Sequence, residues 1–523
     1  MTVQEAFSMA IEHHRAGQLA EAMELYRRIL AHQPEHAESH YQLGCILYMQ
    51  GYLDGAIGSY QSALALRPGS PQALIRLADV YLDKGDADRA MEYCLQSLRA
   101  SPEFAEAHNT LGNLQRARGD LDSALAAFEQ ALRLDPNLAP TLYNVGNIYH
   151  ARGYPDEALA AYRRAVEINP NWLAARNNLA GALAAAGQTD EAIAVYQECI
   201  RRNPEFGHAH YNMGLAMLRK GDFARGFDEY EWRWRVPEMC LYGGLSPKTY
   251  WDGKELHGRR ILLYGELGFG DVIQCARYWS EAGRRGGEII LVCPIELQPL
   301  LKSQPVDGIA QFVREWVAVA EPFPRHDVHC PLMSMPKILN YSIDAIPADV
   351  PYIRGEAKRT EYWRDRLGEE NRLRIGVAWA GRSTPDPLRS MRLEKLAPLA
   401  NLPGIRWISL HKGEASAQAK APPRGMELID WTADFEDFSD TAALIENLDL
   451  VISVDTGVAH LAGAMGKPVW TMLPFLADWR WFLERSDSPW YPTMRLFRQK
   501  RPREWEPVIA EVGEALKVFC AVR

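Results

Sequence analysis

The sequence is poor in the features that mark exported, membrane-spanning or nucleic-acid-binding chains. Its eight cysteines lie far apart without a CxxC pair, which favours buried, reduced thiols over disulfides or a metal site. No run of about 18 apolar residues occurs, so we expect no membrane span. The first residues lack a basic patch followed by an apolar stretch, which predicts a cytoplasmic location. The 58 Lys and Arg residues are outnumbered by 67 Asp and Glu residues, so we expect no nucleic-acid partner.

A 34-residue period is present throughout the first half of the chain. Proline recurs at this interval, at Pro34, Pro68, Pro102, Pro136, Pro170 and Pro204. An alanine precedes each proline at a constant distance, at Ala22, Ala56, Ala90, Ala124, Ala158 and Ala192. A glycine precedes each alanine in the same way, at Gly17, Gly51, Gly85, Gly119, Gly153 and Gly187. This period with these residues is the signature of the tetratricopeptide repeat (TPR), a helical hairpin.

Each of these residue types has a physical role in a hairpin. Glycine adopts the left-handed backbone that ends the first helix, alanine lets the two helices approach, and proline ends the second helix. We predict six full repeats and a divergent seventh over residues 1–235, which form a superhelix with a concave groove. In the seventh unit Gly226 replaces the alanine, and the segment from Tyr230 to Arg235 replaces the usual end. We therefore expect this last hairpin to dock on the domain that follows.

One position in the first helix of each repeat is expected to face the groove. In the last three units this position is asparagine: Asn144, Asn178 and Asn212. Asparagine offers both a donor and an acceptor, so a row of them can hold an extended peptide by its backbone. The row resembles the TPR arm of protein O-linked N-acetylglucosamine transferases, which implies a protein or peptide acceptor in the groove. The alternative is that these asparagines cap or bridge helices.

The second half changes from helical repeats to an α/β pattern. Residues 236–258 are a predicted linker, because prolines and glycines interrupt the helical pattern. An apolar strand over 260–264 leads into the glycine-rich turn 265–271, after which a helix and a second strand follow. This order makes a βαβ unit of the nucleotide-binding type, in a predicted Rossmann-like domain of residues 259–355. The turn is not a GxGxxG fingerprint, so we do not expect a nicotinamide cofactor.

A second Rossmann-like domain is predicted for residues 356–523. Its strongest signal is the stretch 449–468, in which a buried strand runs into a helix. Thr456 stands at the N-cap, and the free amides of Gly457 and its neighbours point out of the helix end, which makes an anion site. His460 lies one turn further along the same face and so reaches the same anion.

The sequences GELGFGD (265–271) and SVDTGVAHLAGAMGKP (453–468) resemble the bacterial heptosyltransferase family and its relatives fused to TPR arms. The resemblance covers about residues 250–505. It implies a GT-B fold, in which two Rossmann-like domains face across a cleft, so that the whole chain is an all-α TPR superhelix followed by an α/β GT-B module. It also implies an inverting, metal-independent sugar transfer, with a nucleotide-sugar as co-substrate and no cofactor.

The same resemblance assigns roles to individual residues. Asp271 matches the family's candidate base, which takes the acceptor proton, and the alternative is that Asp271 only caps its helix. The predicted donor-binding residues are Gly268, Gly270, Arg389, Lys412, Asp455, Thr456, Gly457 and His460. Arg389 and Lys412 are chosen for their position, because each stands just beyond a predicted strand of the second domain, and they are expected to stabilise the leaving diphosphate. Asp455 is assigned to structure or to the ribose. The lysine that heptosyltransferases carry in the loop of Arg389 has no counterpart here.

Three functions remain open from the sequence. The first is an enzyme that glycosylates a protein presented by the TPR groove. The second is a glycolipid-modifying, heptosyltransferase-like enzyme that uses the TPR arm for assembly. The third is a binding scaffold whose transferase module is inactive. The asparagine row and the size of the array favour the first function, and the intact Asp271 and DTGVAH segment argue against the third.

Overall fold

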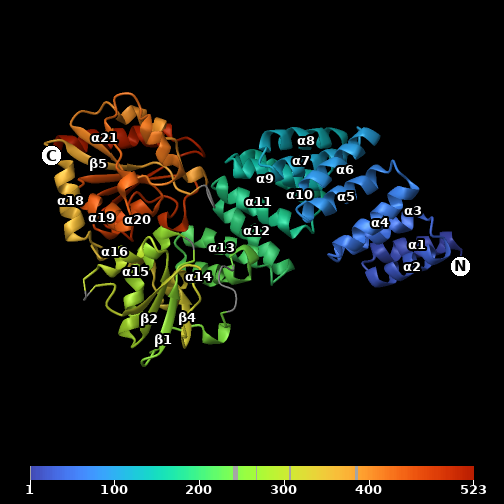
Figure 1. Ribbon diagram of the computed structural model, residues 1–523, viewed down its shortest axis with the longest axis horizontal. Coiled ribbons are helices and arrows are strands. Elements are labelled where there is room, and N and C mark those ends of the chain that lie inside the picture. Colours follow the sequence, from blue (N-terminus) through green and yellow to red (C-terminus); the bar gives the residue numbers. More distant parts are fainter. Residues whose placement is uncertain (1, 240–244, 267, 306–307, 383–386, 523) are drawn as a thin grey trace. The chain divides into compact units, whose positions relative to one another are not determined.

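The computed structural model describes residues 2–239, 245–266, 268–305, 308–382 and 387–522 (Figure 1). The chain divides into two compact units, residues 1–179 and 180–523. The second unit contains the last TPR hairpin together with both sheets of the α/β half. The finer boundaries at residues 235, 258 and 355 stay predictions.

Helical hairpins follow one another up to Tyr230. Their helices are α1 (Val3–Arg15), α2 (Leu19–His32), α3 (Ala37–Met49), α4 (Leu53–Leu66), α5 (Pro71–Asp83), α6 (Ala87–Ala100), α7 (Ala105–Ala117), α8 (Leu121–Leu134), α9 (Ala139–Ala151), α10 (Pro155–Ile168), α11 (Leu173–Ala185), α12 (Thr189–Arg202), α13 (Gly207–Arg219) and α14 (Phe223–Tyr230). A glycine with positive φ follows the first helix of each hairpin, from Gly17 (φ 75°) to Gly221 (φ 85°). The predicted left-handed helix ends, and with them the TPR array, are confirmed.

Close contacts between the two helices of a hairpin explain the remaining repeat positions. The alanines of the repeat, such as Ala22 and Ala124, are fully buried between helices. A further glycine in the first helix lies under the ring of the second: an added Cβ on Gly112 would lie 2.5 Å from the Phe128 ring, and one on Gly146 would lie 2.6 Å from the Tyr162 ring. The aromatic ring therefore packs against the first helix of its own hairpin.

Two parallel sheets make up the α/β half. The first has the order β3-β2-β1-β4, with β1 (Arg260–Tyr264), β2 (Glu288–Cys293), β3 (Val313–Ala318) and β4 (Val328–Pro331). The second has the order β10-β9-β8-β5-β6-β7, with β5 (Leu373–Ala378), β6 (Ile405–Ser409), β7 (Leu428–Ile429), β8 (Leu450–Val454), β9 (Val469–Leu473) and β10 (Met494–Arg498). In both sheets the fourth strand returns beside the first, which is the Rossmann order. The fold class is thus a helical TPR array followed by two parallel sheets of the kind that GT-B domains contain.

Helices and short 3-10 segments cover these sheets. The helices are α15 (Phe269–Arg284), α16 (Gln298–Lys302), α17 (Met335–Ile338), α18 (Ala357–Leu367), α19 (Phe438–Glu446), α20 (Gly457–Ala464) and α21 (Glu506–Val522). Two 3-10 segments matter for the site: η1 (Glu231–Arg235) after the last hairpin and η10 (Trp479–Trp481) after β9. Across the described ranges, every helix is too short or too polar to cross a membrane.

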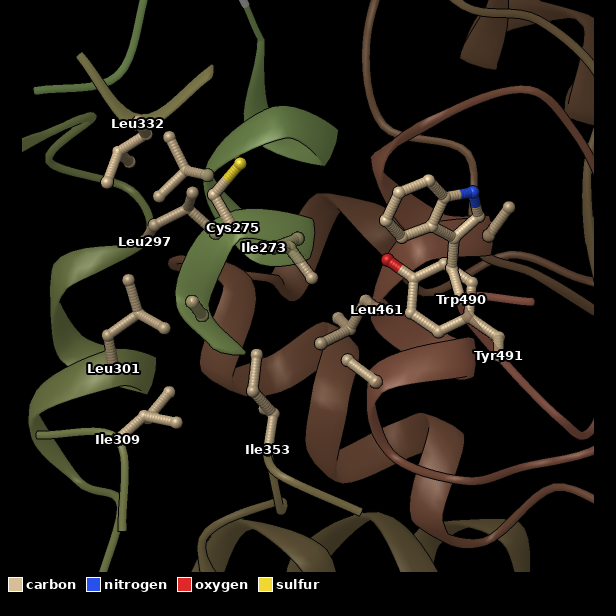
Figure 2. Close-up of a cluster of buried hydrophobic side chains, with 14 of the residues drawn as sticks. Ile273, Cys275, Leu297, Leu301, Ile309, Leu332, Ile353, Leu461, Trp490 and Tyr491 are labelled. Atoms are coloured by element: carbon tan, nitrogen blue, oxygen red, sulfur yellow. The ribbon is translucent and has the colours of Figure 1, made fainter. Parts of the chain in front are cut away.

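A shared core joins α15, which follows the first sheet's β1, to α20 of the second sheet. Ile273 and Cys275 of α15 belong to the same buried cluster as Leu461 of α20, together with Trp490 and Tyr491 (Figure 2). Because close-packed side chains resist displacement, this core holds the first turns of the two helices in a fixed relation. Those first turns carry most of the residues that the sequence assigns to the site.

Candidate functional site

The Rossmann order locates a candidate site at the carboxyl ends of the strands. In such sheets ligands bind where neighbouring strands connect in opposite directions, which here means between β1 and β4 and between β5 and β8. The first turn of α15 follows β1, and the first turn of α20 follows β8. The two predicted motifs therefore occupy equivalent positions in the two sheets.

Asp271 accepts a capping hydrogen bond in the first turn of α15. Gly268 is the N-cap residue, and its amide donates a hydrogen bond of 2.6 Å to Oδ2 of Asp271. The other carboxylate oxygen, Oδ1, accepts a hydrogen bond from the guanidinium of Arg480 in η10. The helix-capping role is therefore present in the structure. A carboxylate oxygen accepts more than one hydrogen bond, so Asp271 keeps the capacity to accept a further proton donor.

The first turn of α20 leaves its backbone donors unused. Thr456 stands at the N-cap, but its side chain makes no capping bond and instead lies 3.0 Å from the Ser453 hydroxyl. The expected capping bond of Thr456 is thus replaced by a hydroxyl pair. Within the described part of the chain, the amides of Gly457 and Val458 have no hydrogen-bond partner. Such amides at the positive end of a helix bind anions.

The two helix starts touch each other. A Cβ added to Gly270 would lie 2.6 Å from Cδ2 of His460, and one added to Gly457 would lie 3.2 Å from Cβ of Phe269. The amides of Phe269 and Gly270 also lack partners among the described residues. Each helix start carries roughly half a positive charge, so their contact is electrostatically unfavourable until an anion joins them. The structure brings Gly268, Gly270, Thr456, Gly457 and His460 together, as one site requires.

His460 and Asp455 form a buried polar pair beside this contact. Nδ1 of His460 lies 2.9 Å from the Tyr491 hydroxyl, and Nε2 lies 3.7 Å from Oδ1 of Asp455. Burial by itself raises the pKa of Asp455, but the hydrogen bond and charge of His460, with the charge of Arg389, outweigh it and lower the pKa. Asp455 is therefore an anion that orients His460. This geometry agrees with a structural role for Asp455.

The two predicted cations differ in their surroundings. Arg389 is half-buried and close enough to lower the pKa of Asp455, so it belongs to the same cluster. Lys412 is exposed, and its ammonium group donates to the carbonyl of Phe435. A third cation, Arg382, lies over the ring of Phe269 with Cζ 5.1 Å from the ring centroid. Arg382 is therefore a neighbour of the first turn of α15 that the sequence motifs did not single out.

Two asparagines of the row, Asn144 and Asn178, bridge neighbouring repeats. Nδ2 of Asn144 donates to Oδ1 of Asn113 at 3.0 Å, and Nδ2 of Asn178 donates to Oδ1 of Asn147 at 2.9 Å. Asn144 is also mostly buried, with 8% of its surface exposed. These contacts correspond to the alternative in which asparagines tie helices together. Asn212 lies in α13, in the second compact unit.

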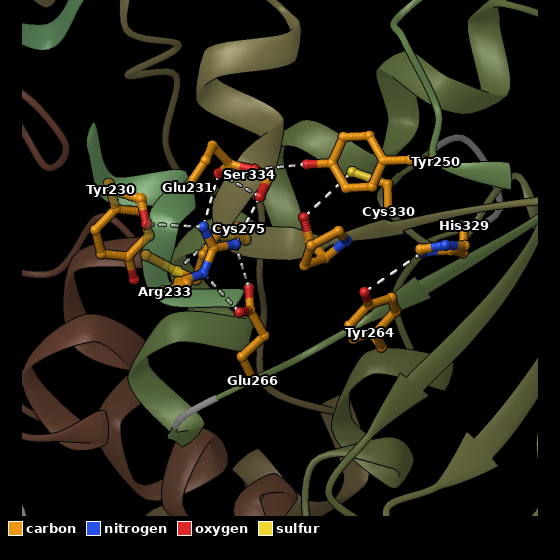
Figure 3. A network of polar contacts seen from close by, with 12 residues as sticks. Tyr230, Glu231, Arg233, Tyr250, Tyr264, Glu266, Cys275, His329, Cys330 and Ser334 are labelled. Atoms are coloured by element: carbon orange, nitrogen blue, oxygen red, sulfur yellow. Dashed lines mark hydrogen bonds and ion pairs between the residues drawn. The ribbon is translucent and has the colours of Figure 1, made fainter. Parts of the chain in front are cut away.

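Two buried arginines near the glycine-rich turn were missed in the sequence. Arg480 bonds to Gln274 as well as Asp271, and Arg233 of η1 forms an ion pair with Glu266, with 2.8 Å between Nε and Oε1 (Figure 3). Both arginines lie in aromatic segments, residues 230–235 and 474–482 (PFLADWRWF), and the second of these resembles the TPR-fused relatives of the heptosyltransferases. Neither segment indicates that its arginine bonds to the glycine-rich turn, which is far away in the sequence.

The acidic, histidine and cysteine side chains of the described residues are dispersed. Within the residues that the structure describes, no three His, Cys, Asp or Glu side chains are grouped to hold a metal ion. Metal independence stays a prediction, because it concerns the reaction rather than the fold.

Comparison with known families agrees with this arrangement. Tetratricopeptide repeat families match residues 7–71, 47–114, 103–171 and 137–205. Glycosyltransferase family 9 (heptosyltransferase) matches residues 436–473, which run from just before α19 to the end of β9 and include Asp455 to His460. The chain therefore carries N-terminal TPR repeats followed by a glycosyltransferase family 9-like region.

Individual relatives are more distant. Protein FlbA of Caulobacter vibrioides is 24% identical over 340 residues, which are 58% of this chain and 54% of FlbA. The chain thus spans about half the length of the curated relative it matches. Among solved structures, the thermophilic TPR protein TTC0263 of Thermus thermophilus is 25% identical, with a TM-score of 0.33, over 35% of this chain and all of that one. A tetratricopeptide repeat protein of Parabacteroides merdae is 19% identical, with a TM-score of 0.34, over 44% and 91% respectively.

Proposed function

We propose that the chain is an inverting, metal-independent glycosyltransferase that moves a sugar from a nucleotide-sugar to a protein bound by the TPR array. The observation that carries the proposal is the contact between the first turns of α15 and α20, where four backbone amides lack partners among the described residues. One of these turns lies in the segment that matches glycosyltransferase family 9. TPR repeats are protein-binding elements, which supports a protein acceptor.

The donor half of the site is suited to a leaving phosphate. Backbone amides and the two helix ends stabilise negative charge without any side-chain rearrangement. His460 and Arg389 add a hydrogen-bond donor and a fixed cation, and Arg382 supplies a second cation at the start of α15. In the proposed reaction these groups stabilise the nucleoside phosphate as its bond to the anomeric carbon breaks.

The acceptor half depends on Asp271. In the proposed step an acceptor hydroxyl attacks the anomeric carbon from the face opposite the leaving phosphate, so the configuration inverts. Asp271 takes the hydroxyl proton through the remaining lone pairs of its carboxylate, whose side chain is 13% exposed. The bond from the acceptor oxygen to carbon forms while the bond from carbon to the phosphate oxygen breaks, and the nucleotide leaves with the electron pair.

The test begins with donor binding and proceeds to transfer. Calorimetry of UDP-, GDP-, ADP- and CMP-sugars in excess chelator is expected to identify a donor that binds without divalent metal. Intact-mass analysis of co-expressed candidate proteins then detects transfer. Asp271→Ala should lower the transfer rate by about 10² to 10⁴ while donor affinity is kept. Complete loss of donor binding on chelation would contradict the metal-free mechanism.

A matched control separates catalysis from helix capping. Asp120 caps α8 by accepting a hydrogen bond of 3.1 Å from the Ser123 amide, far along the chain from the α/β half. Asp120→Ala therefore removes a capping aspartate without touching the proposed reaction. If Asp271→Ala changed transfer no more than Asp120→Ala does, Asp271 would be a cap only.

A heptosyltransferase-like activity on a glycolipid is the second candidate. The matched family carries the description heptosyltransferase, which favours this alternative. Transfer of heptose to a lipopolysaccharide core, with no modified protein in any co-expression, would select it. Failure to bind any nucleotide-sugar would leave the inactive scaffold.

A further inference from the structure

One side chain at the end of the TPR array, that of Arg233, forms an ion pair with Glu266 of the glycine-rich turn. The seventh hairpin, α13 and α14, lies in the same compact unit as both sheets. It continues directly into η1, whose Arg233 is 1% exposed and lies beside Glu266 (Figure 3). Glu266 is two residues before Gly268, the N-cap of α15, and its side chain is also buried.

Every N–H group of the Arg233 guanidinium has an acceptor. Nε and Nη2 donate to the two carboxylate oxygens of Glu266, at 2.8 and 3.1 Å. Nη1 donates to Glu231 at 2.7 Å and to the Tyr230 carbonyl at 3.4 Å, and Nη2 also donates to Ser334 at 2.6 Å. A planar fork that meets a carboxylate with two parallel bonds fixes both the position and the plane of that carboxylate.

The two carboxylates around Arg233 differ: burial raises the pKa of Glu266 against the opposing charge and hydrogen bonds of Arg233, whereas Glu231 is kept charged. The Ser334 hydroxyl donates to Glu231 at 2.7 Å, and the Tyr250 hydroxyl donates to the other oxygen of Glu231 at 2.9 Å. Burial raises the pKa of Glu231, but the charge and hydrogen bonds of Arg233 outweigh it, so the pKa lies below its ordinary value. The network is thus fully bonded and rigid.

The glycine-rich turn is consequently anchored at two points. Glu266 is held by Arg233 of the TPR end, and Asp271 is held by Arg480 of η10. The amides of Phe269 and Gly270, for which the described residues offer no hydrogen-bond partner, lie between these two anchors in the sequence. If Glu266 moved, the start of α15 would shift relative to α20, with which it is in direct contact.

We propose that Arg233 is a positioning residue for the transfer reaction. Through its two hydrogen bonds to Glu266, the segment that ends the TPR array holds the glycine-rich turn, and with it Asp271 and the start of α15, in place. This inference rests on the proposed function for its catalytic consequence. It makes the seventh hairpin a part of the transferase module rather than of the acceptor-binding arm.

The experiment compares Arg233→Lys with Arg406→Lys in the full chain. Lysine keeps the charge but cannot bond to both oxygens of Glu266. Arg406 is the matched control, because it forms a partly buried ion pair with Glu370 at the amino end of β6, away from the turn. Arg233→Lys should speed amide deuterium exchange about tenfold in the peptide spanning residues 264–272. It should lower kcat between about tenfold and a hundredfold with little change in donor KM. Arg406→Lys should do neither.

A triple variant addresses loss of folding. In Arg233→Met with Glu266→Met and Glu231→Gln, no carboxylate of the network is left without its cation, so the thermal midpoint should be close to wild type. The turn should still exchange fast and kcat should stay low. Recovery of slow exchange and wild-type kcat in this variant would overturn the proposal, as would unchanged exchange in Arg233→Lys. If wild-type protein transferred no sugar from any donor while Arg233→Lys still loosened the turn, the proposed function would fail and the anchoring role would stand.

Discussion

Replacing Gly270 with alanine adds a methyl group where the first turns of α15 and α20 touch. The new Cβ would lie 2.6 Å from Cδ2 of His460, whereas ordinary van der Waals contact begins at 3.4 Å. His460 cannot yield easily, because it is 4% exposed and is hydrogen-bonded to Tyr491 at 2.9 Å. The two helix starts must therefore separate by roughly 1 Å, and well-packed cores oppose a shift of this kind.

The expected effect on stability is small and that on turnover is large. Overpacking costs about 1–3 kcal/mol, and alanine in a helix recovers about 1 kcal/mol relative to glycine, so a net loss of about 0–2 kcal/mol is expected. A misplacement of about 1 Å in an active site can lower kcat by about 10². The assays are thermal unfolding of the full chain and steady-state transfer with the donor found by calorimetry.

Gly58 provides the control for helix propensity alone. It lies within α4, and an added Cβ there meets no atom within 4 Å. Gly58→Ala should therefore raise stability by about 1 kcal/mol and leave transfer unchanged. If Gly270→Ala raised stability as much as Gly58→Ala and kept wild-type turnover, the close contact between α15 and α20 would be refuted.

Three further predictions concern the ion pair of Arg480, the protonation of His411 and the hydrogen bonds of Asn178. Arg480→Met should destabilise the chain by about 1–3 kcal/mol, because the partly buried Asp271 and the more exposed Asp478 both lose their cation. Arg485→Met, at an exposed pair, should cost about 0–1 kcal/mol, and equal thermal shifts would contradict the pairing of Arg480. Burial lowers the pKa of His411 to about 4, so as pH falls below about 6.5 the histidine of the unfolded chain binds a proton before that of the folded chain does. The free energy of unfolding should therefore fall by about 2 kcal/mol between pH 7 and pH 5. In the His411→Phe variant, denaturant titrations at the two pH values should show no such fall. Asn178→Ala removes two hydrogen bonds to the preceding repeat and should lower thermal stability by about 1–3 kcal/mol; a loss of acceptor affinity with no thermal shift would instead support a free groove asparagine.

Much of the fold followed from local periodicity. The 34-residue period predicted the hairpins, since a glycine with positive φ and a buried alanine are required in each unit whatever surrounds it. The strand predicted over 260–264 coincides with β1, because an apolar run of strand length before a glycine-rich turn has few other structures available. The helix starts that follow Gly268 and Thr456 were likewise predictable, since helix starts after a strand use short, local sequence patterns, and their binding of an anion stays a prediction.

Helices, strands and motifs could be predicted from the sequence, because hydrogen bonding and hydrophobic periodicity act between residues close in the chain. The contacts between these elements became visible in the three-dimensional fold. In the fold, Asp271 pairs with Arg480 and Glu266 pairs with Arg233. These residues are far apart in sequence, and no repeating pattern in the sequence predicts their contacts. The fold also shows the amide groups of Asn144 and Asn178 bonded to the preceding repeat, because a side chain's hydrogen-bond partner depends on the spacing between helices and not on residue type.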